Sequence, residues 1–401
     1  MKIKNQIYLD NNSTTPLSPF VKEKVVDFMN NHFENPSSLS YPGGWYVAEL
    51  IKIAREEVAN LLNALPEEIY FTSGATESNN LALTVLEGGK LKSNQPEVIT
   101  TQVEHRSILE PLFKYRDIAK INFIGTEADG CVNLEELSNL LNSNTKLVSI
   151  SLANNEIGSI NKLKRISKII QDHYQSQSDT TPPIFHSDIT QALGKMRVDL
   201  NELGLDLASF SAHKLYALKG CGALWIKKKN SLNENTRDLK SLIKPLIVGG
   251  GQEDGIRAGT LNTVGIIGLG KACLELSNSL EKDISYLKSL SLYLHKQISE
   301  IKNIKLNGPE IEKRLPGNLN YALPIDTSAK LFNLIRTKIA FSSGSACSTG
   351  KLSHVLLALD PTGDIAKRSI RIGIGRYNSH EEINTAVSII KDAISKILNN
   401  N

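Results

Sequence analysis

Short apolar runs rich in β-branched residues alternate with amphipathic stretches through the first half of the chain. This alternation most constrains the fold, because strands separated by helices usually form a parallel sheet with helices on its faces. Residues 47–62 carry apolar side chains at helical spacing, which predicts a surface helix that packs on the core. The sequence therefore predicts a mostly parallel α/β sheet, with strands at 68–72, 97–101, 120–124, 147–152, 183–187, 207–210 and 223–226.

The length and the later pattern predict more than one domain. A chain of 401 residues suits a large domain and a smaller one. A long helical run at about 264–301 is expected to carry the chain into the second domain, and apolar residues at helical spacing near the C-terminus predict a helix that covers a small sheet. We expect an N-terminal arm at 1–20 that packs with the small domain, a large domain at 21–262 and a small α+β domain at 263–401.

Charge and cysteine spacing exclude several classes of protein. The 46 basic and 42 acidic residues are interspersed and give a formal net charge of +4, so no nucleic-acid-binding surface is indicated. The four cysteines lie far apart without a C-x-x-C spacing, which argues against a disulfide framework and against a structural zinc site. The N-terminus lacks the apolar core of a signal peptide, and no stretch approaches a membrane span. We expect a cytoplasmic protein with no membrane partner, no direct nucleic-acid partner and no permanent metal.

Polar side chains follow the ends of the predicted strands, where ligands bind in open α/β sheets. The turn at 73–76 consists of small residues and enters a helix, so its free backbone N–H groups and the helix dipole suit a phosphate. The other strands are followed by His105, by Asn155, by Asp188 with Gln191, and by Ser211-Ala212-His213-Lys214. These groups are expected to meet at one edge of the sheet.

Together these side chains meet the needs of pyridoxal 5′-phosphate (PLP). PLP requires a lysine for a Schiff base, an acid beside the pyridine nitrogen, phosphate donors and a flat group against the ring. Each residue alone has an ordinary explanation, such as a helix N-cap for an aspartate at a strand end or a common connection for a glycine turn. The combination favours a PLP site, with Lys214 as the lysine, Asp188 as the acid, His105 as the stacking group and Thr76, Ser211 and His213 as the donors.

Five motifs in order resemble the cysteine desulfurases of the class V aminotransferase group. They are T-S-G-A-T-E-S-N-N-L-A-L from Thr72, A-N-N-E-I-G from Ala153, F-H-S-D-I-T-Q-A-L-G-K from Phe185, S-A-H-K from Ser211 and S-S-G-S-A-C from Ser342. The resemblance runs from Tyr8 to about Glu382, which is nearly the whole chain. It implies the fold type I PLP-dependent transferase fold, with a large, mostly parallel sheet of seven-stranded type, a small α+β domain and a homodimer with composite active sites.

The resemblance also implies a role for individual residues. It places Asp188 at the ring nitrogen, His105 against the ring as a proton-transfer group, and Lys214 as the residue that carries the cofactor. The remaining roles are phosphate binding by Ala75, Thr76, Ser211 and His213, phosphate binding in the partner subunit by Thr260, contacts near the phenolic oxygen by Asn155 and Gln191, and substrate binding by Asn35, Asn155 and Arg371.

The sulfur chemistry rests on Cys347. In the implied mechanism the amino group of L-cysteine displaces Lys214, the freed lysine removes the α-proton, and the Cys347 thiolate takes the sulfur as a persulfide while alanine leaves. Small polar neighbours indicate an exposed loop for Cys347, although the stretch from it to Ser353 is shorter than in close relatives. The implied acceptors are an iron–sulfur scaffold protein or the machinery of tRNA thiolation, with Cys347 as a transient cluster ligand at most.

Two other interpretations are open from the sequence. A cysteine or cystine C–S lyase, or a selenocysteine lyase, would use the same fold and cofactor without a persulfide on Cys347. A cofactor-free binding module would keep the fold but would lack the visible absorption of bound PLP and would be unaffected by Lys214→Ala.

Overall fold

A computed structural model describes residues 6–87, 95–175, 181–228, 237–343 and 352–399. At its centre lies a seven-stranded sheet in which only β8 runs antiparallel to its neighbours. The predicted mostly parallel sheet is therefore confirmed, and each predicted run contributes one strand. In spatial order the strands are β2 (Ile69–Thr72), β8 (Gly222–Ile226), β7 (Leu207–Ser211), β6 (Ile184–Asp188), β5 (Thr145–Ser149), β3 (Glu97–Thr101) and β4 (Lys120–Ile124).

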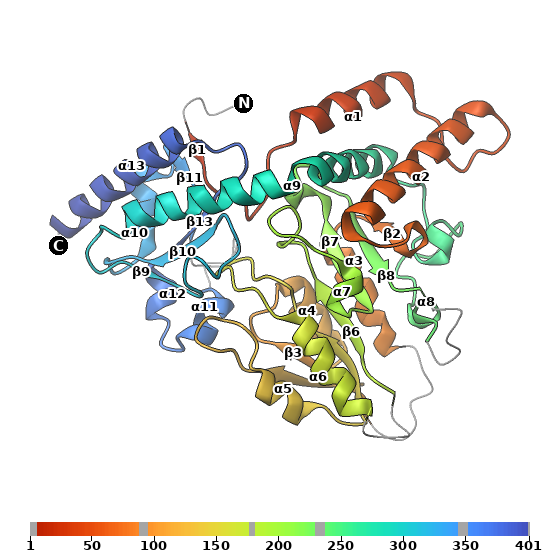
Figure 1. Ribbon diagram of the computed structural model, residues 1–401, viewed down its shortest axis with the longest axis horizontal. Helices are drawn as coiled ribbons and strands as arrows, with labels where there is room; N and C mark the ends of the chain where they lie inside the picture. The colour runs from red at the N-terminus through yellow and green to blue at the C-terminus, as the bar shows by residue number, and fades with distance from the viewer. Residues whose placement is uncertain (1–5, 88–94, 176–180, 229–236, 344–351, 400–401) are drawn as a thin grey trace.

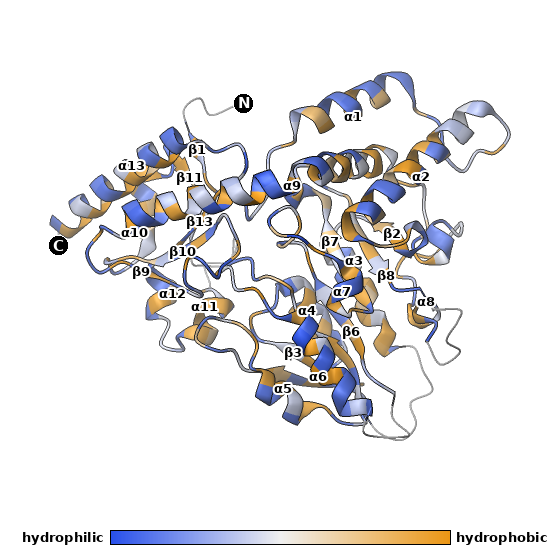
Figure 2. Ribbon diagram, in the orientation of Figure 1, coloured by the Kyte–Doolittle hydropathy of each residue, from blue (hydrophilic) through white to orange (hydrophobic). Residues whose placement is uncertain are grey.

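Helices surround this sheet, and apolar faces of several of them are buried in the core (Figures 1 and 2). The helix predicted from the apolar spacing at 47–62 is α2 (Pro42–Leu62), and it packs along α9 (Thr263–Ile298). The contact is close, since a Cβ added at Gly270 would lie 2.6 Å from Ala54 Cα. The other helices around the sheet are α1 (Pro19–Asn31), α3 (Ala75–Leu83), α4 (Arg106–Lys114), α5 (Leu134–Leu140), α6 (Leu163–Gln175), α7 (Leu200–Leu203) and α8 (Leu239–Leu242).

The C-terminal third forms a second, smaller core around an antiparallel sheet. The predicted C-terminal helix is α13 (His380–Asn399), and its apolar stripe is buried in this core. The sheet has the order β12 (Ser342–Ser343), β13 (Ser369–Gly373), β10 (Asn318–Ala322) and β9 (Lys305–Leu306). Around it lie α10 (Ser328–Ile335), α11 (His354–Leu359) and α12 (Asp364–Arg368).

Two segments join the parts of the molecule. The first half of α9 packs in the large core and its second half packs in the small one, so this helix is shared by both (Figure 1). Near the N-terminus, β1 (Ile7–Tyr8) pairs with β11 (Ile339–Ala340). The proposed boundaries at residues 20 and 262 stay predictions. Within the described ranges, no helix is long and apolar enough to cross a membrane.

Candidate active site

The carboxyl ends of the central strands open onto a cavity of about 290 Å³. The loops that follow β3, β5, β6 and β7 supply most of its walls, and Arg371 of β13 closes it from the small core. The structure therefore brings together most of the residues predicted from the sequence. Those that line the cavity are Ala75, Thr76, His105, Asn155, Asp188, Gln191, Ser211, His213, Lys214 and Arg371.

One wall is built to receive an anion. Gly74 precedes α3 with a φ of 149°, a conformation that favours glycine, and the first residues of α3, Ala75 and Thr76, line the cavity. Ser211 Oγ lies in the same wall and accepts a hydrogen bond from Ala75 N at 2.7 Å. His213 Nδ1 lies 3.0 Å from Thr14 Oγ1, and burial lowers the pKa of His213 to about 4. This wall thus presents neutral and backbone donors.

Asp188 and His105 lie on other sides of the cavity. Asp188 is 9 % exposed, and its two carboxylate oxygens accept hydrogen bonds from Thr190 N at 2.9 Å and from Asn79 Nδ2 at 2.8 Å. His105 caps the N-terminus of α4 by accepting from Ser107 N at 3.1 Å. Burial lowers the pKa of His105, so the imidazole is kept neutral.

Lys214 is the last residue of a 3₁₀ turn directly after β7, and it lines the cavity. Its ammonium donates to Asn12 O at 2.6 Å and to Ser13 O. A second lysine, Lys195, lies buried nearby and donates to Asn12 Oδ1 at 2.7 Å and to Gln191 Oε1 at 3.2 Å. Burial lowers the pKa of Lys195 to about 7. The two lysines therefore hold Asn12 between them.

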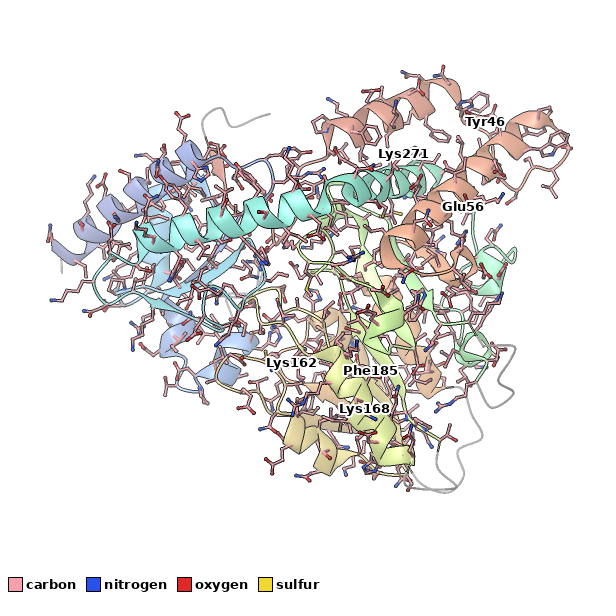
Figure 3. All side chains as sticks on the ribbon, in the orientation of Figure 1. Tyr46, Glu56, Lys162, Lys168, Phe185 and Lys271 are labelled. Atoms are coloured by element: carbon pink, nitrogen blue, oxygen red, sulfur yellow. The ribbon has the colours of Figure 1, made fainter. Side chains whose placement is uncertain are left out.

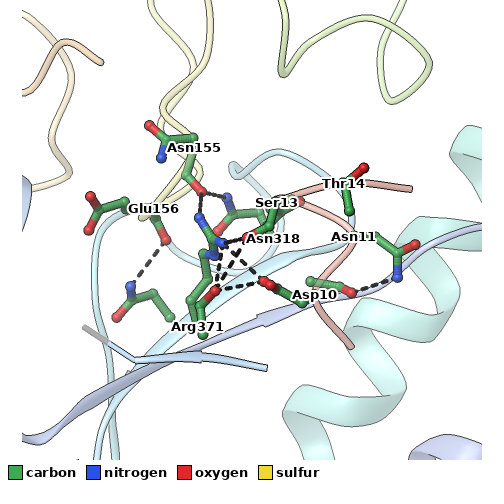
Figure 4. Close-up of polar contacts among 12 residues, drawn as sticks. Asp10, Asn11, Ser13, Thr14, Asn155, Glu156, Asn318 and Arg371 are labelled. Atoms are coloured by element: carbon green, nitrogen blue, oxygen red, sulfur yellow. Dashed lines mark hydrogen bonds and ion pairs between the residues drawn. The ribbon is translucent and has the colours of Figure 1, made fainter. Parts of the chain in front are cut away.

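Arg371 adds a positive charge to the cavity wall from the small core (Figure 4). Its guanidinium forms an ion pair with Asp10 Oδ1 at 3.0 Å and donates to Asn155 O at 3.0 Å. It also donates to Ser13 Oγ at 2.6 Å and to Ser342 Oγ at 2.9 Å. Arg371 Nε is buried without a hydrogen-bond partner among the described residues. A carboxylate that entered the cavity would meet a guanidinium already held in place by Asp10.

Two of the described site residues that were predicted do not line this cavity. Asn35 and Thr260 are exposed and lie outside it. Cys347 lies outside the described residues. Two described residues further along the chain, Ser353 and His354, lie near the cavity. Ser353 Oγ donates to Glu156, and His354 Nε2 lies 2.8 Å from Glu104 O.

Sequence reasoning missed several residues of the site. Asn12 and Thr190 line the cavity, and their Asn12 Nδ2 and Thr190 Oγ1 atoms are buried without partners in the described structure. Asn79 belongs to the motif that begins at Thr72, but its role cannot be predicted from the sequence. The residues of a helix do not indicate which carboxylate a buried amide will contact. No group of three or more potential metal ligands occurs within the described ranges.

Comparison with known proteins gives a consistent family. The family described as "Aminotransferase class-V" matches residues 7–385 of the chain. The chain is similar to "Cysteine desulfurase IscS" of Rickettsia bellii, at 39% identity over 98% of this chain and 92% of the relative. It is also similar to "Cysteine desulfurase, mitosomal" of Trachipleistophora hominis, at 37% identity over 98% of this chain and 87% of the relative. Among solved structures, a "NIFS-LIKE PROTEIN" has a TM-score of 0.86 at 32% identity, covering 97% of this chain and 99% of the other.

Proposed function

Because the chain belongs to the aminotransferase class-V family, and within it to the cysteine desulfurases, we propose that it uses PLP to convert L-cysteine to L-alanine and leaves the sulfur as a persulfide on Cys347. The observation that carries the proposal is one cavity lined by Lys214, Asp188 and His105, with an anion-binding wall at α3 and a guanidinium opposite. This arrangement separates a site for a phosphate from a site for a substrate carboxylate.

The donors around the cavity fit PLP. Thr76, Ser211, His213 and the first amides of α3 suit its phosphate, and the carboxylate of Asp188 suits a protonated ring nitrogen. Asn12 Nδ2 and Thr190 Oγ1 have no partner among the described residues, which also favours a polar ligand, because buried polar atoms normally have partners. When bound, PLP would withdraw electron density from the α-carbon of the substrate and so weaken its bonds.

The protein groups move the protons. Lys214 Nζ takes the α-proton of cysteine, and the Asp188 carboxylate stabilises positive charge at the ring nitrogen. His105 is neutral because burial lowers its pKa, so it can donate one proton and recover it within a turnover. Arg371 binds the substrate carboxylate, and its pairing with Asp10 fixes the guanidinium before substrate arrives.

Sulfur transfer is assigned to Cys347. Its thiolate attacks the sulfur of the substrate, a sulfur–sulfur bond forms, and the Cβ–S bond breaks with its electron pair left on carbon. Protonation of that carbon releases alanine, so one sulfur atom passes from cysteine to the enzyme thiol and nothing else is consumed. One solved relative is described as "SspA in complex with cysteine", with a TM-score of 0.77 at 29% identity over 93% of this chain and all of the other, which supports cysteine as the substrate.

We propose a homodimer from the surface at α1 and α2. Phe33 is 93 % exposed, Leu39 is 75 % exposed, and Tyr46 extends from the outer part of α2 (Figure 3). A second copy is the occupant that suits this apolar surface, because Asn35 and Thr260 are then free to serve the partner's cavity. Light scattering should give twice the chain mass of 44.1 kDa, and a mass near 44.1 kDa would refute the dimer.

The acceptor of the sulfur and the location are further proposals. The relatives named IscS favour delivery to an iron–sulfur scaffold protein, with tRNA thiolation as the other destination. A cytoplasmic location stays a prediction, because one of the relatives is described as mitosomal.

The decisive experiment follows the sulfur atom. Protein loaded with PLP is incubated with L-cysteine, and mass spectrometry of the Cys347 peptide should show one added sulfur atom together with formation of alanine. Cys347→Ala should keep the visible absorption of bound PLP but lose turnover, whereas Cys131→Ala, at a half-buried thiol outside the cavity, should match wild type. Full turnover by Cys347→Ala would favour a lyase, and absence of PLP absorption in the wild type would favour a binding module.

A further inference from the structure

The buried amide of Asn79 connects Asp188 and His105, two cavity residues that lie far apart in the sequence. Asn79 lies on α3, is 0 % exposed, and is not one of the residues that line the cavity. Its Nδ2 donates to Asp188 Oδ2 at 2.8 Å and to Ser107 Oγ at 2.8 Å. Ser107 Oγ in turn lies 2.7 Å from His105 Nδ1. One amide nitrogen therefore contacts Asp188 directly and His105 through a hydroxyl.

The direction of these hydrogen bonds is fixed at the histidine end. Ser107 N lies 3.1 Å from His105 Nδ1, and a backbone N–H can only donate, so Nδ1 is an acceptor. The neutral imidazole must then carry its proton on Nε2. Because Ser107 Oγ already accepts from Asn79, its own hydrogen is available for Nδ1 as well.

The direction is also fixed at the aspartate end. Asp188 accepts one hydrogen bond from Asn79 and one from the backbone amide of Thr190, at 2.9 Å. These two donors fix the orientation of the carboxylate in the cavity. A reversed carboxamide at Asn79 would place its oxygen against that carboxylate. The observed orientation instead leaves Asn79 Oδ1 buried without a partner among the described residues, which indicates that the two donor contacts decide the orientation.

We propose that Asn79 is a positioning residue that couples Asp188 to His105: its amide fixes the orientation of the carboxylate and, through Ser107, holds the imidazole with its proton on Nε2. The inference rests on the proposed PLP chemistry. It adds that one side chain, Asn79, orients both Asp188, which would face the ring nitrogen, and His105, which would exchange protons. Both acidic and basic functions of the cavity would then respond to a change at a residue that contacts neither cofactor nor substrate.

The test separates the two arms of this network. Asn79→Ala removes the donor to Asp188 and the support of Ser107, whereas Ser107→Ala removes the hydroxyl between Asn79 and His105 and leaves the contact of Asn79 with Asp188 in place. PLP affinity of the apoprotein reports on the first arm, and the pH profile of kcat/KM reports on the second. The matched control is Asn80→Ala, because Asn80 is on the same helix and donates instead to Thr76 O, within that helix.

Asn79→Ala should weaken PLP binding by about tenfold, the effect of losing one hydrogen bond to a charged group. Ser107→Ala should keep PLP affinity within about twofold but move the acidic limb of the profile to higher pH by roughly 0.5 to 1 pH unit, since the neutral imidazole loses a donor at Nδ1. Ser107→Thr should restore the wild-type limb. The other charged or titratable groups around His105 are the same in all variants: Glu104, which precedes it in the chain, and Asp188, Lys214, His354 and Glu156.

Wild-type PLP affinity in Asn79→Ala, or a Ser107→Ala profile that overlays the wild type, would overturn the coupling. So would an equal loss in Asn80→Ala, because the effect would then come from disturbance of α3. If Asn79→Ala fails to fold, the Ser107 variants still decide the histidine arm. Failure of the wild-type apoprotein itself to bind PLP would refute the proposed function and not the reading of these contacts.

Discussion

Glu104 offers the sharpest test of the electrostatics beside the cavity. This carboxylate precedes His105, is 2 % exposed, and has no cationic partner among the described residues. It accepts hydrogen bonds from Thr101 Oγ1 at 3.1 Å and from Ser151 N at 3.0 Å, and a further one from Ser151 Oγ. Burial outweighs these donors and raises the pKa of Glu104 from 4.5 to about 7.

The sign and size of the effect follow from that pKa. Because the folded protein holds the proton more tightly than the unfolded chain, the contribution of Glu104 to stability is fully present below pH 4.5 and is lost as the pH rises to about 7. A difference of about 2.5 pH units at 1.36 kcal/mol per unit amounts to roughly 3 kcal/mol, most of it between pH 5 and 8. Unfolding entropy of about 2.1 cal/mol/K per residue over 401 residues converts this to a change in Tm of about 4 °C in all, of which about 3 °C falls between pH 5 and pH 8.

The assay compares Glu104→Gln with wild type. Gln keeps the shape but cannot ionise, so the Tm of the variant minus that of the wild type should increase by about 3 °C from pH 5 to pH 8, both proteins being saturated with PLP. Glu110→Gln removes an exposed carboxylate, with 62% of its side-chain surface accessible, and serves as the control that should parallel wild type. A Tm difference that stays constant within about 1 °C over this range would refute the reasoning.

Three further predictions concern packing and thiols. Arg376→Ala should lower stability by about 3 kcal/mol, seen as a lower Tm, because it leaves the partly buried carboxylate of Glu275 without its 2.5 Å ion pair; an unchanged Tm would mean that the pair contributes nothing. Gly222→Ala should lower stability by about 2 kcal/mol and weaken PLP binding, because the new Cβ would lie 2.6 Å from Gly74 Cα in the turn that enters α3; wild-type thermal stability and PLP affinity would contradict the geometry. Cys221 should resist iodoacetamide at pH 8 in the folded enzyme, since burial raises the pKa of its thiol to about 12, and rapid alkylation detected by mass spectrometry would show that the thiol is accessible.

Much of the fold was predictable because its signals are local. A strand in a parallel sheet is buried on both faces, so apolar residues gather in it, as Ile184 and Phe185 do in β6 and as Leu207 and Phe210 do in β7. The site residues at the strand ends were predictable for a related reason, since parallel strands bring their carboxyl ends to one edge of the sheet. Lys214 and Asp188 both lie at such strand ends.

The sequence by itself thus determined the sheet, the helices that cover it and the residues that follow each strand. Only the tertiary structure decided which of those residues touch. The pairing of Arg371 with Asp10 joins residues 361 positions apart, and the contact of Asn79 with Asp188 spans 109 positions. Periodicity is a property of neighbours along the chain, whereas these contacts depend on the spatial order of strands and on how the N-terminal segment lies against β13. For that reason the place of Lys214 at the edge of the sheet could be predicted from the sequence. The contact of Asn79 with Asp188, and through Ser107 with His105, is visible only in the folded chain.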